Sequence, residues 1–124
     1  MKNPALLPLF QELKNILEVY VPPMTVKVDE DGRYDIVSTK AVNVNGRKFE
    51  EVYFGAVIIQ KSYVGFYSMG CYANHEFHIS DNLRKLLKGK SCFHIKKVDE
   101  ELLAALTEMT KQDYLFFERE GYFG

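Results

Sequence analysis

Two histidines and an aspartate in one short segment are the first candidates for chemistry in this sequence. His75 and His78 are three residues apart, and Asp81 follows them. Three residues is a spacing that brings two side chains to one face of a helix. Imidazole nitrogens and a carboxylate oxygen form a ligand set that iron, zinc or manganese accepts. The sequence predicts a metal site at these residues, and a polar loop with two titrating histidines is the alternative.

Tyrosines supply a second candidate site, for an organic ligand. The chain has eight Tyr and nine Phe but no Trp. Tyr53, Tyr67 and Tyr72 lie on or beside two expected strands, and a cleft lined by tyrosine rings suits a small organic molecule. Core packing with the hydroxyl groups at the rim is the alternative explanation for the same residues.

Two charged clusters are further candidates. Carboxylates at Asp29, Glu30 and Asp31, together with Asp35, could collect hard cations, although a solvated turn explains them as well. Basic side chains gather around Gly89 and could hold an anion, or could simply complement the dipole of a helix C-terminus. They are Arg84, Lys85, Lys88, Lys90, Lys96 and Lys97.

Each of the two cysteines lies close in sequence to a histidine. Cys71 precedes His75, and Cys92 precedes His94 by two residues, so a thiol–imidazole nucleophile is conceivable. Because no third residue that would orient such a pair is evident, we expect buried structural thiols in a reducing compartment. The sequence therefore favours a protein that is not an enzyme.

Length and charge narrow the class of protein further. A chain of 124 residues has the length of one domain, which we expect to span residues 1–124. A formal net charge of −1 gives no long-range attraction to nucleic acid. The longest apolar stretch, near Val57 to Ile59, is too short to cross a membrane, and the N-terminus lacks the apolar run of a signal peptide. We expect a cytoplasmic protein that binds neither nucleic acid nor membranes.

Hydrophobic periodicity predicts the elements that must position these residues. Helical spacing of apolar residues marks a first helix over 8–20 and a last helix that begins after Asp99, and a short helix is expected from residue 80 or 81 to Gly89. Strands are expected over 24–29, 34–39, 41–44, 47–52, 53–60, 63–69 and 91–96. The prediction is an α+β two-layer sandwich, in which an antiparallel sheet of about five to six strands has the N- and C-terminal helices on one face.

The segment 53–60 is apolar on both faces and is expected to be the central strand. Simple alternation places Tyr53 and Val57 on one face, and Tyr63 and Tyr67 together on a face. Five late aromatic residues are more apolar surface than one helix face hides in a monomer, which predicts a homodimer. They are Tyr114, Phe116, Phe117, Tyr122 and Phe123.

Several segments resemble a known family. Residues 52–57 (Val-Tyr-Phe-Gly-Ala-Val) and 61–67 (Lys-Ser-Tyr-Val-Gly-Phe-Tyr) are similar to the paired central strands of the YdhG-like family of bacterial domains of unknown function. Residues 83–93 and 96–102 are similar to that family's closing helix, strand and helix. The resemblance covers about half of the chain, roughly residues 52–111.

The resemblance implies a small α+β sandwich comparable with frataxin. One member of the family is described as a frataxin-like intracellular iron chaperone, so the resemblance also implies iron binding without catalysis. The iron ligands here would be Asp29, Glu30 and Asp31, or His75 and His78. The alternative function is a small-molecule- or protein-binding module that uses the tyrosine-rich face of the sheet.

Overall fold

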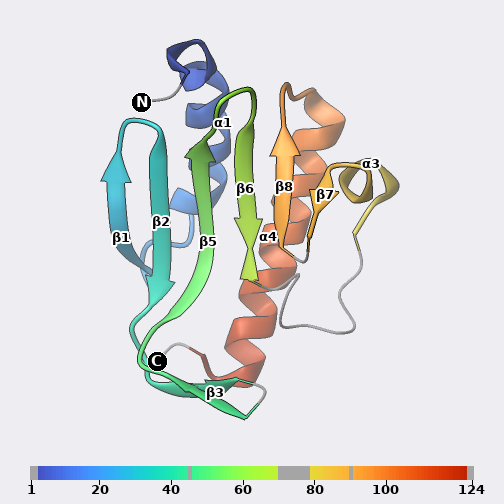
Figure 1. Cartoon of the computed structure of the whole chain (residues 1–124). Helices are drawn as coiled ribbons and strands as arrows, with labels where there is room; N and C mark the ends of the chain where they lie inside the picture. Colours follow the sequence, from blue (N-terminus) through green and yellow to red (C-terminus); the bar gives the residue numbers. More distant parts are fainter. Residues whose placement is uncertain (1–2, 45, 70–78, 90, 123–124) are drawn as a thin grey trace.

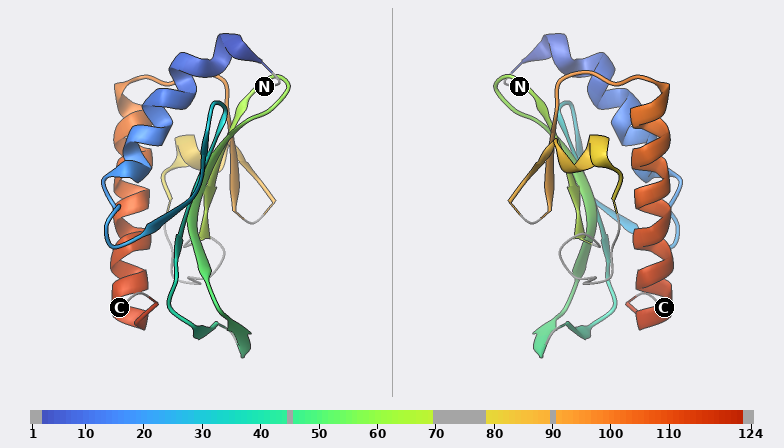
Figure 2. Two further views of the ribbon diagram at one scale, coloured as in Figure 1. Left: turned by 90° about the vertical axis from the view of Figure 1, so that its left-hand side faces the viewer. Right: turned by 90° about the vertical axis from the view of Figure 1, so that its right-hand side faces the viewer.

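Six antiparallel strands form one open sheet, and two long helices pack on one of its faces (Figures 1 and 2). The computed structural model of the chain describes residues 3–44, 46–69, 79–89 and 91–122. In spatial order the strands are β1 (Thr25–Glu30), β2 (Arg33–Ser38), β5 (Val52–Ile59), β6 (Val64–Ser68), β8 (Cys92–Ile95) and β7 (Leu87–Lys88). The helices are α1 (Leu7–Glu18) and α4 (Glu100–Glu120). This arrangement confirms the predicted α+β class.

Four smaller elements are found in the described part of the chain. A short 3-10 helix, η1 (Pro4–Leu6), leads into α1, and the four-residue helix α3 (Asp81–Arg84) precedes β7. The strands β3 (Val42–Val44) and β4 (Arg47–Phe49) form a separate hairpin that projects beyond one end of the main sheet (Figure 1).

The core lies between the sheet and the two helices. Leu13 and Leu17 of α1 and Phe117 of α4 are at most 1% exposed, and they cover Phe54 of the central strand β5. The rings of Phe54 and Phe117 meet edge to face with centroids 5.2 Å apart. Burying each side chain of this size contributes about 1.5–3 kcal/mol, so this layer dominates the stability of the fold.

A polar contact within this layer joins the sheet to α4. Ser68 of β6 and Asp113 of α4 are both almost completely buried, and the Ser68 Oγ donates a hydrogen bond of 2.5 Å to Asp113 Oδ2. A buried polar group is costly unless it is paired, so this contact fixes how α4 is rotated against the sheet.

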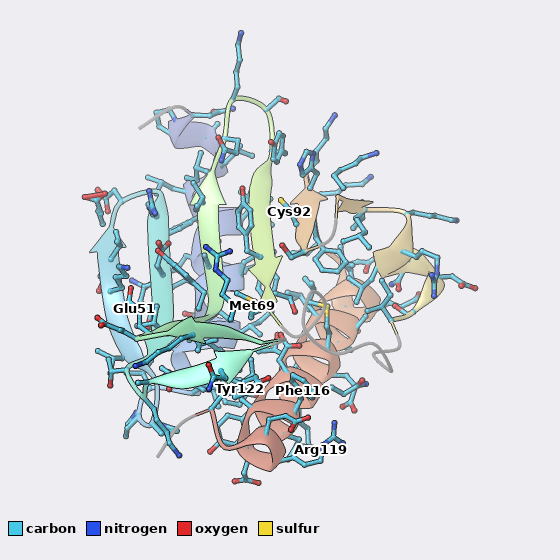
Figure 3. The ribbon with its side chains drawn as sticks, turned by 60° about the horizontal axis from the view of Figure 1, so that its bottom comes forward. Glu51, Met69, Cys92, Phe116, Arg119 and Tyr122 are labelled. Carbon is cyan, nitrogen blue, oxygen red and sulfur yellow. The ribbon has the colours of Figure 1, made fainter. Side chains whose placement is uncertain are left out.

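The late aromatic residues are buried within the chain. Phe116, Phe117 and Tyr122 are each less than a tenth exposed, and their rings pack edge to face (Figure 3). Three of the five residues behind the homodimer prediction are thus buried by the chain itself, because the Tyr122 ring packs on both Phe rings. Phe123 lies outside the described residues. The homodimer stays a prediction, but these buried rings do not support it.

Both ends of α4 follow their sequence signals. Asp99 Oδ1 accepts a 2.8 Å hydrogen bond from the backbone N–H of Leu102, which confirms Asp99 as the N-cap. Gly121 ends the helix with a φ of 71°, in the left-handed conformation that glycine adopts without steric cost.

The predicted short helix ends earlier than expected. It covers only Asp81–Arg84, after which Leu87 pairs with Phe93 and Lys88 pairs with Cys92 in the β7–β8 ladder. Gly89 does have a positive φ of 72°, but it lies in the connection between β7 and β8 and does not cap a helix. Pairing with β8 overrides the local helical pattern of the leucines.

A β-bulge in β5 changes which side chains share a face. Ile36 pairs with Gly55, whereas the next residue of β2 pairs with Tyr53, so Phe54 is an extra residue in the ladder. A Cβ added to Gly55 would lie 3.0 Å from Leu17 of α1, so Phe54 and Gly55 both face the helices. The predicted shared face of Tyr53 and Val57 is therefore wrong, because the bulge inverts the alternation between them.

The two edges of the sheet differ from its centre. Strand β1 is mostly exposed, carries Lys27, Asp29 and Glu30, and has an irregular register between Val26 and Val28. The opposite edge, β7, is only two residues long. Among the described residues, no helix combines the length and apolar character that crossing a bilayer requires.

The N-cap of α4 gives a direct test of this fold. We expect Asp99→Ala to lower the free energy of unfolding by about 1 kcal/mol, because the N–H of Leu102 loses its acceptor. Urea unfolding followed by circular dichroism measures this change. Asp99→Ser keeps an acceptor at the cap and serves as the control. An equal loss of stability in both variants would contradict the capping role.

Candidate functional site

The face of the sheet opposite the helices carries the side chains that are free to meet a ligand. The register aligns Ala56 of β5, Tyr67 of β6, Cys92 of β8 and Lys88 of β7 in one row across four strands. Directly opposed residues project to the same face of a sheet. The residues next to this row, such as Val57, Phe66 and Phe93, are buried beneath the helices. The row therefore projects to the opposite face, which we call the open face.

A pocket of about 370 Å³ opens on this face over β2, β5 and β6. Ala56 and Ile58 give the pocket an apolar floor, and the rings of Tyr53 and Tyr67 also line it. Arg33, Asp35 and Met69 also line the pocket. The volume is within the range of sites that hold small organic molecules. Both described tyrosines of the predicted ligand site therefore line one cavity.

An ion pair from β2 forms the polar end of the pocket. Arg33 Nη2 donates to Asp35 Oδ2 at 2.8 Å, and Arg33 Nε lies 3.2 and 3.3 Å from the two carboxylate oxygens. The Asp35 side chain is 1% exposed, whereas that of Arg33 is 46% exposed. A guanidinium has five N–H donors, so about three remain for water or a ligand. The pair is neutral overall and offers hydrogen-bond donors to the pocket.

Tyr67 lies flat along the sheet because Gly65 has no side chain. A Cβ at Gly65 would be 2.9 Å from the Tyr67 ring and 3.3 Å from its hydroxyl oxygen. The Tyr67 hydroxyl has hydrogen bonds with the side chains of Cys92 and Gln60. Burial, followed by the contact with Cys92, raises the pKa of Tyr67 to about 12, while the bond from Gln60 lowers it. Tyr67 is thus a neutral donor at physiological pH.

The thiol on this face is poorly suited to nucleophilic chemistry. Burial raises the pKa of Cys92 above its ordinary value of 9.0, and the hydrogen bond with Tyr67 lowers it only in part. These directions fit a chain in which Gln60 donates to the Tyr67 oxygen and Tyr67 donates to the Cys92 sulfur. The thiolate, which is the reactive species, is therefore a minor form at neutral pH. Cys71 lies outside the described residues.

The Tyr53 ring, which lines the pocket, lies beside an ion pair. The Lys27 ammonium of β1 lies 5.1 Å from the centroid of the Tyr53 ring and forms an ion pair with Glu51, just before β5 (Figure 3). Tyr53 is 36% exposed. A cation over the face of a tyrosine restricts the ring, so this wall is positioned even though it faces solvent.

The predicted metal site stays a prediction, because only one of its three ligands, Asp81, belongs to the described residues. Tyr72, His75 and His78 lie outside the described residues, and Asp81 is an exposed residue at the start of α3. The part of the chain that the structure describes contains no group of three or more His, Cys, Asp and Glu side chains placed to hold a metal.

The acidic residues of the first hairpin are separated. Asp29 forms an ion pair with Lys14 of α1 at 3.0 Å, whereas Asp35 projects to the open face and pairs with Arg33. These two carboxylates therefore contact different basic residues on different faces of the sheet.

Sequence reasoning missed Arg33, Gly65 and the role of Asp35. Arg33 and Asp35 flank Tyr34, and their opposite charges at a spacing of two residues were a readable signal. The predicted strand 34–39 began one residue too late to include Arg33, which is the first residue of β2. Gly65 stands two residues before Tyr67, and a glycine inside a strand often marks a place that another group approaches closely.

Comparisons of the chain with protein-family models, with curated proteins and with solved structures found no match.

The raised pKa of Cys92 predicts how its alkylation varies with pH. The rate should rise about tenfold for each pH unit and level off only above pH 9.0, because the reaction needs the thiolate. Tyr67→Phe removes the hydroxyl that lowers the thiol pKa, so its plateau should move to still higher pH. Peptide-resolved mass spectrometry measures the rate at Cys92. A plateau below pH 9.0 in the folded protein would contradict this environment.

The iron hypothesis is tested separately. If His75 and His78 supply ligands, anaerobic titration with Fe²⁺ should show saturable binding that His75→Ala/His78→Ala abolishes. His94→Ala removes the remaining histidine and serves as the control. The lack of saturable binding at iron concentrations on the order of tens of micromolar would remove this hypothesis.

Proposed function

We propose that this protein binds a small, flat, uncharged organic molecule on the open face of its sheet, and that it does so as a binding module rather than as an enzyme. The observation that carries the proposal is the pocket of about 370 Å³, in which two tyrosines flank an apolar floor beside the Arg33–Asp35 pair.

The apolar floor and the aromatic walls select for a flat ligand. Ala56 has a small side chain and is 6% exposed, and the neighbouring Ile58 is half-buried. A ring placed over these residues would lose water on one face and meet the tyrosines at its edges. The Tyr67 hydroxyl is engaged with Cys92 and Gln60, which holds its ring in place before any ligand arrives.

The polar end of the pocket selects for a hydrogen-bond acceptor without charge. Arg33 keeps N–H donors that do not contact Asp35, and these suit a carbonyl or hydroxyl oxygen. A carboxylate would meet a guanidinium whose charge the buried Asp35 already balances. A neutral acceptor is therefore the better match.

No group on this face that the structure describes is prepared for catalysis. The Cys92 thiol has a raised pKa, and the charged side chains Arg33 and Asp35 pair with each other. Recognition by shape and hydrogen bonding accounts for the arrangement. The iron-chaperone function stays a prediction that the Fe²⁺ titration addresses, and the YdhG-like kinship stays a prediction as well.

Two related probes test the site. Indole-3-carboxaldehyde has a flat ring and a carbonyl acceptor, and indole lacks the acceptor. We expect both to shift the backbone amide resonances of Gly55, Ala56 and Tyr67 with dissociation constants on the order of 1 mM, as is usual for fragments. Ala56→Leu fills the floor and should weaken both probes about tenfold or more. Leu115→Ala, an exposed residue on α4, is the control.

The polar end is tested by changing both members of the ion pair. Arg33→Gln alone would leave a buried carboxylate without its partner, so Arg33→Gln/Asp35→Asn is the informative variant. It should weaken the aldehyde about tenfold and leave indole within about twofold, because only the aldehyde uses the guanidinium. Resonance shifts that map away from this face, or equal effects on both probes, would contradict the proposed mode of binding.

A further inference from the structure

A second cavity is larger than the pocket around Tyr53 and Tyr67 and is lined by different residues, among them several lysines. It encloses about 890 Å³ between the α3–β7 segment, the end of β8 and the start of α4. Two aromatic residues also line it: Tyr63, which precedes β6, and His94 of β8. The cavity is independent of the pocket around Tyr53 and Tyr67, with which it shares none of its described lining residues.

Four lysines from separate parts of the chain surround this cavity. Lys85 ends α3, Lys88 lies in β7, and Lys96 and Lys97 follow β8. Within the described ranges, no carboxylate lies within 4.0 Å of any of these four ammonium groups. They were four of the six basic residues that the sequence placed around Gly89, and Lys90 lies outside the described residues. The fold gathers them around one hollow.

The acidic groups at the cavity do not balance this charge. Asp99 and Glu101 also line it, and Asp99 is engaged as the N-cap of α4. Among the described lining residues, four lysines and two carboxylates leave an excess of two positive charges. Since the formal net charge of the whole chain is −1, all its other residues together carry −3. An anion small enough to enter the cavity is attracted, whereas an extended polyanion would also meet the negative remainder.

A pair of stacked rings gives the cavity an aromatic side. Tyr63 and His94 lie parallel, with centroids 3.8 Å apart and planes inclined by 14°. Leu86, Val98 and Leu102 add apolar surface nearby. A small inorganic anion would contact the lysines but not the aromatic rings. A ligand that has both a flat ring and an anionic group would contact the rings as well as the lysines.

We propose that this cavity is a site for a small phosphate-bearing organic anion with a flat ring, of the size and chemistry of a nucleoside diphosphate. The phosphates lie among Lys85, Lys88, Lys96 and Lys97, and the ring lies against the Tyr63–His94 stack. The excess of two positive charges favours a multiply charged phosphate over a monocarboxylate. The volume is within the range of sites that hold molecules of this size.

Calorimetric titration with ADP and with inorganic pyrophosphate tests the proposal. Lys88→Gln/Lys96→Gln should weaken both probes about tenfold or more. Lys48→Gln/Lys111→Gln removes the same charge outside the cavity and should change either affinity by less than about twofold. His94→Ala should weaken ADP and spare pyrophosphate, because only ADP has a ring. The affinity of both probes should fall as salt rises.

Three results would overturn the proposal. One is equal weakening by the two lysine pairs, which would show diffuse attraction to the surface. Another is amide resonance shifts that avoid His94 and Lys88 when ADP is added. The third is tighter binding of a DNA duplex than of ADP, which would show that the ligand is nucleic acid and not a small anion. Circular dichroism of each variant shows that a loss of affinity is not a loss of fold.

Discussion

Burial of one face of the sheet beneath α1 and α4 is the constraint on which the rest of the molecule depends. Val57, Phe66 and Phe93 are at most 1% exposed in this layer. A shift of one residue in any of these strands would turn its buried side chains to the other face, at a cost of about 1.5–3 kcal/mol for each large one. The hydrophobic layer therefore determines which residues the open face presents, Tyr67 and Cys92 among them.

The sequence predicts the parts of this architecture that follow from local patterns. The two long helices, the cap at Asp99 and the central position of β5 were all readable, because apolar periodicity and capping chemistry act within a few residues. The bulge at Phe54 was not readable, since an extra residue in one strand is defined only against the register of its neighbour. The β7–β8 pairing was missed for a similar reason.

The candidate sites divide in the same way. Tyrosines and lysines were singled out by residue type, but only the fold shows which of them share a cavity. The alternation that predicted a common face for Tyr53 and Val57 failed at the bulge, and the same bulge places Tyr53 beside the Arg33–Asp35 pair. Without the bulge, regular alternation would have placed Tyr53 on the other face of the sheet from Arg33 and Asp35. Two of the three predicted metal ligands, His75 and His78, lie outside the described residues, whereas Asp81 is described at the start of α3.

The edges of the sheet have a consequence for how the protein behaves at high concentration. Unpaired backbone groups of an edge strand are where chains add to one another in fibrils. Here one edge carries Lys27, Asp29 and Glu30 and an irregular register, and the other is only two residues long. Charge and irregularity obstruct a further strand on the first edge, and the second offers little to pair with. Aggregation through strand addition is therefore disfavoured, even though α1 and α4 both pack on the same face of the sheet (Figure 2).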